Sequence, residues 1–169
     1  QMQGDIVRRL FGKELTDQST AAQFGRDLTR YSTPYSESER VRARLKAAFP
    51  GIRIGVVSNT AIQPHIIDEF LVECRLQQYL DFRVYSSAVG WRKPHPAIYE
   101  AALKEAGVLP HEVVFVGDSV FEDVRGPQLM GMKAVFCKRR PLDEDTGADA
   151  VVEDLVPIPE LVKRFAAGK

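Results

Sequence analysis

A group of acids directly follows one of the most apolar runs of this sequence. Residues 113–116 are all apolar, Asp118 comes after a single glycine, and Glu122 and Asp123 lie within the first turn of the helix expected next. Carboxylates at the end of a buried strand are costly unless a positive group balances them. Together with the hydroxyl of Ser119, Asp118 offers the hard oxygen ligands that Mg²⁺ prefers. The pattern therefore predicts a magnesium site at this strand end.

The helix dipole offers an alternative account of two of these acids. A carboxylate in the first turn of a helix is stabilised by about 0.3–1 kcal/mol without any ligand. This suffices for Glu122 and Asp123 but not for Asp118, which precedes the helix. Zinc is disfavoured, because cysteine ligands and paired histidines are absent from this pattern. We expect capping or surface roles for the three histidines, His65, His95 and His111.

Two other polar segments follow apolar runs and belong at the same edge of the sheet. Ser58 and Asn59 come directly after an apolar pair and can donate hydrogen bonds to an anion, although a helix-capping turn is an equal alternative. Lys93 stands in a loop whose two prolines restrict its direction, although a lone lysine is more often solvated. Because ligand sites of open α/β sheets lie outside the carboxyl ends of the strands, we expect Ser58, Lys93 and Asp118 to converge.

Together these residue types are typical of phosphoryl transfer. A hydroxyl donor, a fixed lysine and a magnesium-binding carboxylate would position a phosphate and neutralise its charge, which supplies most of the catalysis in this reaction class. A small phosphorylated molecule is the expected substrate and Mg²⁺ the expected cofactor. The sequence offers no nucleophile beside these groups, and it lacks the Gly-x-Gly-x-x-Gly turn that a dinucleotide-binding domain requires.

Alternating helical and strand patterns from residue 36 onward indicate an α/β fold, a three-layer doubly wound parallel sheet of Rossmann type. Strands are expected at 52–57, 82–85, 113–116, 133–137 and 150–152. Helices are expected at about 36–48, 66–74, 96–106, 121–130 and 159–165. Ser36 and Glu39 have the spacing of a capping box, and Gly107 and Gly131 stand where left-handed residues end helices.

The first 35 residues contain no strand pattern and no glycine-rich turn. Two amphipathic helices are expected there, at about 5–11 and 17–31. Pro34 fixes its own backbone dihedral and favours a hinge into the main body. We therefore divide the chain into a helical appendage at 1–35 and an α/β core at 36–169.

Charge and composition exclude several classes of partner. Lys plus Arg and Asp plus Glu number 23 each, so no net field attracts nucleic acid or an anionic membrane. The short basic cluster at 138–140 is interpreted as a solvated loop without a role. No apolar run approaches the ~20 residues of a membrane span. Cys74 and Cys137 lie in apolar segments and are expected to be buried thiols, which favours a reducing, cytoplasmic setting.

In its ordered motifs, the region from about 35 to 165 resembles the haloacid dehalogenase superfamily of hydrolases. Ser58-Asn59 looks like the second motif of that family, residues 93–96 like the third, and residues 117–123 like the fourth. Three motifs in the right order make the resemblance far stronger than any one of them would. Metal-free dehalogenases generally carry no metal-binding aspartate at the position of Asp118, so the resemblance favours the phosphatase branch.

The resemblance implies a role for each matched residue. Ser58 would bind the transferring phosphoryl group, with Asn59 beside it in the substrate site. Lys93 would stabilise the nucleophile and the phosphoryl charge. The metal site would comprise Asp118, which binds Mg²⁺, and Asp123, which orients the water shell of the ion.

The chain departs from the family at its beginning. The family starts with an apolar strand that ends in an Asp-x-Asp motif and supplies the nucleophile and the general acid/base. Nothing like it precedes Ser58, since Asp5 and Asp17 follow no apolar strand. We expect the first strand and part of a cap domain to lie upstream of Gln1, with residues 1–35 as a partial helical cap.

Two consequences are expected from this departure. The strands that end at Val57 and Val116 should flank an empty slot, which self-association or a strand from another chain could fill. The chain as written should be inactive. The leading hypothesis is the core of a Mg²⁺-dependent phosphomonoester phosphatase, and the alternative is a non-catalytic protein that kept the anion site and binds a phosphate ligand as a sensor or subunit.

Overall fold

The computed structural model describes residues 36–139 and 145–168, so the helices expected at 5–11 and 17–31 lie outside the described residues. Within them, five strands form two sheets, and every strand runs parallel to its neighbour. One sheet pairs β1 (Gly55–Ser58) with β2 (Phe82–Tyr85), and the other has the order β3 (Val114–Gly117), β4 (Lys133–Cys137), β5 (Ala150–Val152). The predictions for β2, β4 and β5 are confirmed to the residue.

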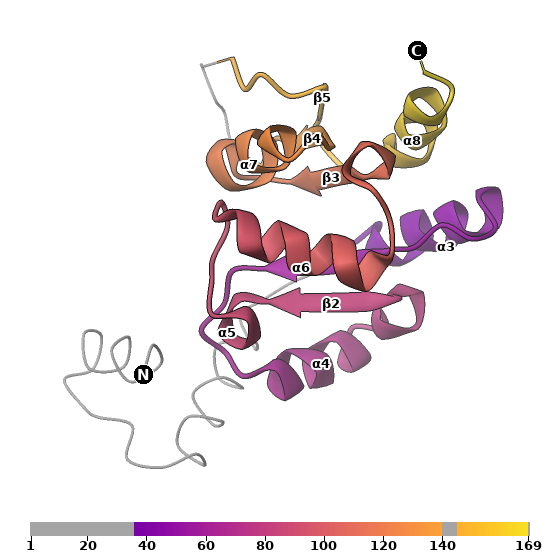
Figure 1. The fold of residues 1–169 in the computed structure, drawn as a ribbon. Coiled ribbons are helices and arrows are strands. Elements are labelled where there is room, and N and C mark those ends of the chain that lie inside the picture. The colour runs from indigo at the N-terminus through magenta and orange to yellow at the C-terminus, as the bar shows by residue number, and fades with distance from the viewer. Residues whose placement is uncertain (1–35, 140–144, 169) are drawn as a thin grey trace, which may run out of the picture.

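Helices connect β1 to β2, β2 to β3 and β3 to β4, and they cover both faces of the sheets (Figure 1). The longer ones are α3 (Ser38–Ala48), α4 (Pro64–Glu73), α6 (Pro96–Ala106) and α8 (Ile158–Ala166). The shorter ones are α5 (Ser86–Val89), α7 (Gly126–Leu129), the 3₁₀ turns η1 (Gln77–Tyr79) and η2 (Pro110–Glu112), and the π-helical η3 (Val120–Arg125). This arrangement confirms the predicted three-layer α/β fold.

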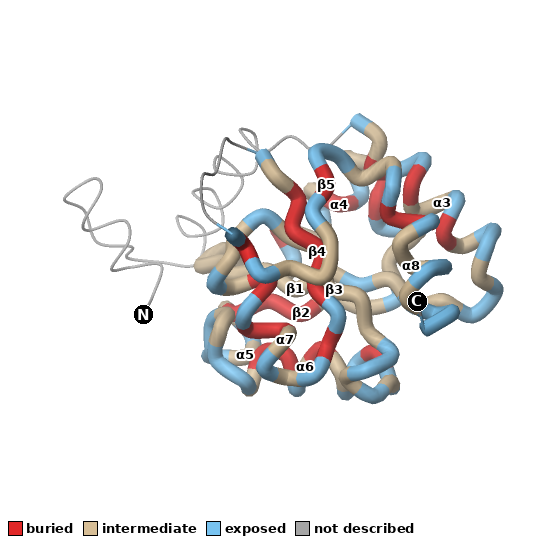
Figure 2. The backbone as a smooth tube through the Cα atoms, turned by 90° about the horizontal axis from the view of Figure 1, so that it is seen from above, coloured by how far each residue is buried: buried red, intermediate tan, exposed pale blue. Residues whose placement is uncertain are grey.

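The strand β4 shows why strands of this fold consist of continuous apolar runs in the sequence. Ala134 and Phe136 belong to a buried cluster with Val124 of η3, whereas Val135 and Cys137 belong to one formed with α3 and α8. Alternate residues of β4 therefore pack on opposite faces, and Figure 2 shows most of the strand as buried. A strand covered on both faces needs apolar residues at every position.

The capping box expected at Ser36 and Glu39 does not form. Instead α3 begins at Ser38, and the Ser36 hydroxyl donates to the carboxylate of Glu37 (3.0 Å). Glu37 in turn accepts a hydrogen bond from the Leu155 amide (3.2 Å), close to the start of α8. The Glu37 side chain thus links the start of α3 to a distant segment and does not cap the helix.

Two other local expectations are corrected. The single helix expected at 121–130 is divided into η3 and α7, and Pro127, which has no amide hydrogen, lies just after the junction. Cys137 is buried as expected, but Cys74 is only half-buried, because it lies at the carboxyl end of α4. Gly107 (φ 66°) and Gly131 (φ 87°) adopt the predicted left-handed conformation after their helices.

A cavity of about 910 Å³ lies between the two sheets. Within the described residues, β1 and β3 belong to different sheets and do not pair with each other. The slot predicted between the strands that end at Val57 and Val116 is therefore confirmed for this part of the chain. The lining is mainly apolar and comes from β1, β3, α3 and α6, for example Leu45, Val56, Ala102, Val114 and Val116.

Asp149 fixes the start of β4. Its carboxylate accepts hydrogen bonds from the Ala134 amide (2.9 Å) and from Gln128 (3.2 Å), and it forms an ion pair with Lys133 (2.6 Å). Burial by itself would raise the pKa of Asp149, but these contacts outweigh it and lower the pKa below its ordinary value. The ionised carboxylate therefore stabilises the fold above a pH of about 4, and this stabilisation is lost as the pH falls through the lower folded-state pKa.

We predict that Asp149→Asn lowers the free energy of unfolding by about 1–3 kcal/mol at pH 7 and by much less at about pH 2. Urea unfolding at the two pH values measures the difference. The exposed Glu153 provides a control, since Glu153→Gln should change the free energy by less than about 0.5 kcal/mol. Equal losses for Asp149→Asn at both pH values would show that its charge is not what stabilises the strand.

Candidate active site

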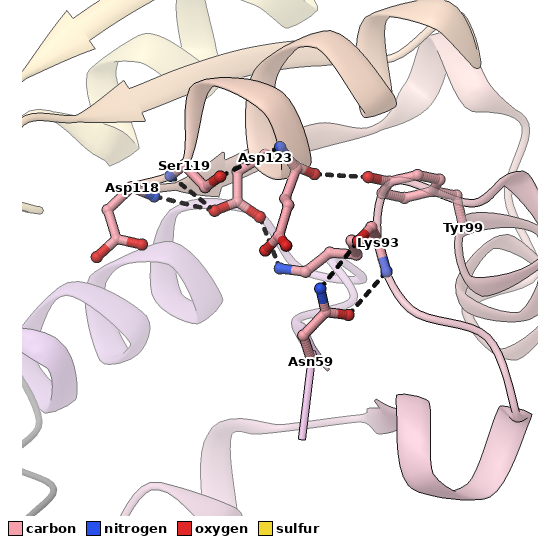
Figure 3. A network of polar contacts seen from close by, with 7 residues as sticks. Asn59, Lys93, Tyr99, Asp118, Ser119 and Asp123 are labelled. Atoms are coloured by element: carbon pink, nitrogen blue, oxygen red, sulfur yellow. Dashed lines mark hydrogen bonds and ion pairs between the residues drawn. The ribbon is translucent and has the colours of Figure 1, made fainter. Parts of the chain in front are cut away.

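The loop that carries Lys93 is tied to the end of β1 by Asn59. The Asn59 side chain donates to the Lys93 carbonyl (3.0 Å), and the Lys93 amide donates to Asn59 Oδ1 (2.7 Å). Figure 3 shows this reciprocal pair, which joins residues 34 apart in the sequence. The Asn59 side chain, predicted to face the substrate, thus holds the lysine loop in the structure.

Lys93 and Asp123 form a buried ion pair at the centre of the site (Figure 3). Lys93 Nζ lies 2.6 Å from Asp123 Oδ1, and the two side chains are only 10% and 6% exposed. The other carboxylate oxygen, Oδ2, accepts hydrogen bonds from the backbone amides of Asp118 (3.1 Å) and Ser119 (3.0 Å). A side chain at Gly117 would collide with this carboxylate, so the end of β3 requires a glycine.

Asp118 differs from Asp123 in its exposure and in its partner. Its side chain is 48% exposed, and its carboxylate points away from Lys93 (Figure 3). Asp118 Oδ2 lies 3.1 Å from Nε of Arg139, which follows β4 and is itself half-exposed. The interpretation of 138–140 as a loop without a role therefore misses Arg139. The sequence could have indicated Arg139 only through the order of the strands, because residues that follow two adjacent parallel strands lie at the same edge of the sheet.

Ser58 is the last residue of β1 and lies beside Tyr85 in the register of the first sheet. The predicted residues Lys93, Asp118 and Asp123 all line the cavity between the sheets. Ser58 and Asn59 are not among its lining residues. The structure therefore brings the cation and the acids together and leaves Ser58 at the strand end beside them.

Of the predicted metal ligands, Asp118 is the one with a half-exposed carboxylate. Both oxygens of Asp123 are engaged, and the Ser119 hydroxyl accepts a hydrogen bond from the Glu122 amide (3.2 Å) as the N-cap of η3. In the ranges 36–139 and 145–168, no three His, Cys, Asp or Glu side chains converge as a metal cluster. A single hard carboxylate nevertheless suits Mg²⁺, which binds one or two carboxylates and keeps several waters. The site therefore fits this ion at Asp118.

A parallel α/β core with a cation and acids at the carboxyl ends of its strands is typical of enzymes that bind their ligand at that edge, and comparison with known proteins identifies the family. The haloacid dehalogenase-like hydrolase family matches residues 5–137. The chain therefore belongs to the haloacid dehalogenase-like hydrolases, which confirms the resemblance seen in its motifs.

Curated relatives include named phosphatases. The chain is 34% identical over 162 residues to a phosphoserine phosphatase of Thermus thermophilus, a match that covers 90% of this chain and 63% of the relative. It is 32% identical over 101 residues to a glyceraldehyde 3-phosphate phosphatase of Pyrococcus furiosus, covering 57% of this chain and 42% of the relative. The chain thus spans less than two thirds of the length of these proteins.

Solved structures share the fold. A HAD phosphatase from Thermococcus onnurineus matches with a TM-score of 0.74 and 24% identity, over 94% of this chain and 69% of that one. The L-2-haloacid dehalogenase of Xanthobacter autotrophicus with covalently bound chloropropionic acid matches with a TM-score of 0.76 and 23% identity, over 95% of this chain and 74% of that one.

Among the described helices, none has the length and apolar character to cross a membrane.

We predict that the two acids contribute differently to stability. Asp123→Asn should lower the free energy of unfolding by about 3–5 kcal/mol, because it leaves the buried Lys93 without a counter-charge. Asp118→Asn should change it by less than about 1 kcal/mol, because the ion pair with Arg139 is half-exposed. Urea unfolding at pH 7 compares the two variants directly. A loss of equal size in both would contradict the assignment of Asp123 as the structural acid of the site.

Proposed function

We propose that this chain is the core of a Mg²⁺-dependent phosphomonoester phosphatase that acts on a small phosphorylated molecule. The observation that carries the proposal is the Lys93 ammonium, held by Asp123 close to the half-exposed Asp118 along the cavity. A fixed cation and a metal-binding acid are the charges that a transferring phosphoryl group needs nearby. The chain is similar to a phosphoserine phosphatase and to a glyceraldehyde 3-phosphate phosphatase, and this similarity supports the same reaction class.

Each residue has a separate task in this mechanism. The Lys93 ammonium binds a phosphoryl oxygen and stabilises its charge, and the Ser58 hydroxyl donates to another oxygen. Asp118 would hold Mg²⁺, which would neutralise further negative charge on the phosphate. Asp123 orients the lysine, and Asn59 fixes the loop that carries it.

The reaction also needs a carboxylate that attacks phosphorus and an acid that protonates the leaving oxygen. Asp123 cannot attack without giving up the bonds made by both its oxygens. We therefore place both groups on an apolar strand that ends in Asp-x-Asp and pairs with the facing edges of β1 and β3. This strand would come from upstream in a longer protein or from another chain. The first carboxylate of this strand bonds to phosphorus while the bond from phosphorus to the ester oxygen breaks, and the acid protonates the leaving oxygen. Water then hydrolyses the acyl phosphate formed on the carboxylate, which releases phosphate.

The setting and the partners are part of the same proposal. Cys74 and Cys137 are far apart in the sequence and form no C-x-x-C motif, which suits a reducing, cytoplasmic compartment. Equal numbers of acidic and basic residues give no field that would favour nucleic acid or an anionic membrane. The partner is then a small phosphorylated substrate, and a second chain is the alternative source of the missing strand.

The 169-residue chain alone should not hydrolyse p-nitrophenyl phosphate. It should gain Mg²⁺-dependent turnover when an apolar strand ending in Asp-x-Asp is fused to it or added as a peptide, because the strand supplies the attacking carboxylate. Release of nitrophenolate with and without Mg²⁺ measures this, and a matched strand ending in Asn-x-Asn is the control. Turnover by the chain alone that Asp118→Asn abolishes would contradict the proposal. A strand-containing form that binds phosphate without turnover would favour the alternative, a non-catalytic phosphate-binding protein.

Lys93→Met should weaken binding of inorganic phosphate to the strand-containing form by roughly tenfold or more, since a charge-assisted hydrogen bond of about 1.4 kcal/mol is lost. Lys133→Met is the matched control. Lys133 also pairs with an aspartate at 2.6 Å, but at the start of β4. Titration calorimetry measures the affinities, with circular dichroism to show that both variants fold. Equal affinities in the two variants would remove Lys93 from the phosphate site.

A further inference from the structure

Tyr99 makes a second link between the segment that carries Lys93 and the helix that carries Asp123. It lies in α6, is fully buried, and its hydroxyl donates to the carbonyl of Glu122 at 2.5 Å. Lys93 and Tyr99 therefore contact neighbouring residues of η3 (Figure 3). The Tyr99 ring packs edge-on against Phe115 of β3, with 5.8 Å between the ring centroids.

The Glu122 carbonyl needs this donor because the helix does not supply one. In η3 the Gly126 amide donates to the Phe121 carbonyl five residues back, which is the π-helical pattern. By the same pattern, Glu122 would receive the amide hydrogen of residue 127, but Pro127 has none. A carbonyl that is shielded from water is destabilising when it lacks a donor. The Tyr99 hydroxyl takes the place of the missing amide.

Gly126 leaves the space through which the hydroxyl reaches η3. A side chain at Gly126 would collide with the Tyr99 hydroxyl, although its φ of −57° is accessible to any residue. The glycine is therefore required by the close approach of Tyr99 and not by its backbone conformation. Burial, together with the charges of Asp123 and Glu122, raises the pKa of Tyr99, so the hydroxyl stays protonated and remains a donor.

We propose that Tyr99 is a positioning residue of the candidate active site. By holding the Glu122 carbonyl, it fixes the π-helical turn that keeps the Asp123 carboxylate on Lys93 and on the amides of Asp118 and Ser119. This inference goes beyond the proposed function, because it concerns the geometry of the ion pair. It is tested without turnover, so its failure is distinguishable from failure of the phosphatase assignment.

NMR spectroscopy of the full 169-residue chain provides the test. Tyr99→Phe keeps the ring and removes the donor, and it should shift the amide signals of Asp118 and Ser119. Hydrogen exchange at these amides and at the Lys93 ammonium should accelerate roughly tenfold, the factor that corresponds to about 1.4 kcal/mol.

Tyr85→Phe is the matched control. Tyr85 is also a buried tyrosine, 4% exposed, and its hydroxyl donates to an aspartate at 2.8 Å at the end of β2. This variant loses a comparable hydrogen bond and should leave the signals of Lys93, Asp118 and Ser119 in place. Unchanged signals in Tyr99→Phe, or equal changes in the two variants, would overturn the proposal.

Pro127→Ala offers a rescue that a packing role cannot produce. It restores the amide hydrogen that the π-helical pattern directs to the Glu122 carbonyl. In the Tyr99→Phe background it should return the amide signals and exchange rates toward those of the unaltered chain. Should Tyr99→Phe fail to fold, Gly126→Ala displaces the hydroxyl while keeping the ring and should give the same changes around Asp123. Absence of rescue, or unchanged signals in Gly126→Ala, would assign Tyr99 to packing alone.

Discussion

The buried ion pair between Lys93 and Asp123 is the interaction on which the rest of the site depends. Lys93 follows the first sheet and Asp123 follows β3 of the second, so the pair joins the two sheets at their carboxyl ends. Two charges at this depth are tolerated only if their geometry is short and their other hydrogen-bonding groups are satisfied. The amides after β3 satisfy the second oxygen of Asp123, and Asn59 and Tyr99 hold the backbone segments that carry the two charges. The polar contacts around the pair therefore fix its geometry.

The same requirement separates the tasks of the two acids. Asp123 is held through both oxygens, so moving its carboxylate toward a ligand would cost two backbone hydrogen bonds and the ion pair. Asp118 is half-exposed, and its partner Arg139 can exchange with solvent or with a cation at little cost. Asp123 can therefore maintain the structure of the site, while Asp118 can bind a charged ligand. Their order in the sequence does not reveal which is which.

Much of the fold could be predicted from local pattern, because β2, β4 and β5 are short apolar runs bounded by turn residues. The convergence of Lys93 and Asp118 could be predicted because parallel strands place their carboxyl ends at one edge. The roles of Asn59, Tyr99 and Arg139 could not, since each depends on a contact with a residue more than twenty positions away or on another strand. The π-helical turn could not be predicted for a related reason. Pro127 cannot donate to the Glu122 carbonyl, and the hydroxyl that does so belongs to Tyr99, which is distant in the sequence.

Helices, rather than strand pairing, hold the two sheets together in the described residues. On one face α6 packs in a single cluster with residues of both sheets, and on the other α3 and α8 pack against the second sheet and the chain leading into β1. These side-chain contacts leave the facing backbone edges of β1 and β3 without strand pairing to each other in the described residues. The apolar walls around a cavity of about 910 Å³ also lose dispersion contacts. Asn59, Lys93 and Asp123, by contrast, already hold one another or neighbouring amides through hydrogen bonds. A strand entering the cavity would therefore add its stabilisation through backbone pairing and apolar contacts, and it would deliver its last residues to a lysine that is already in place.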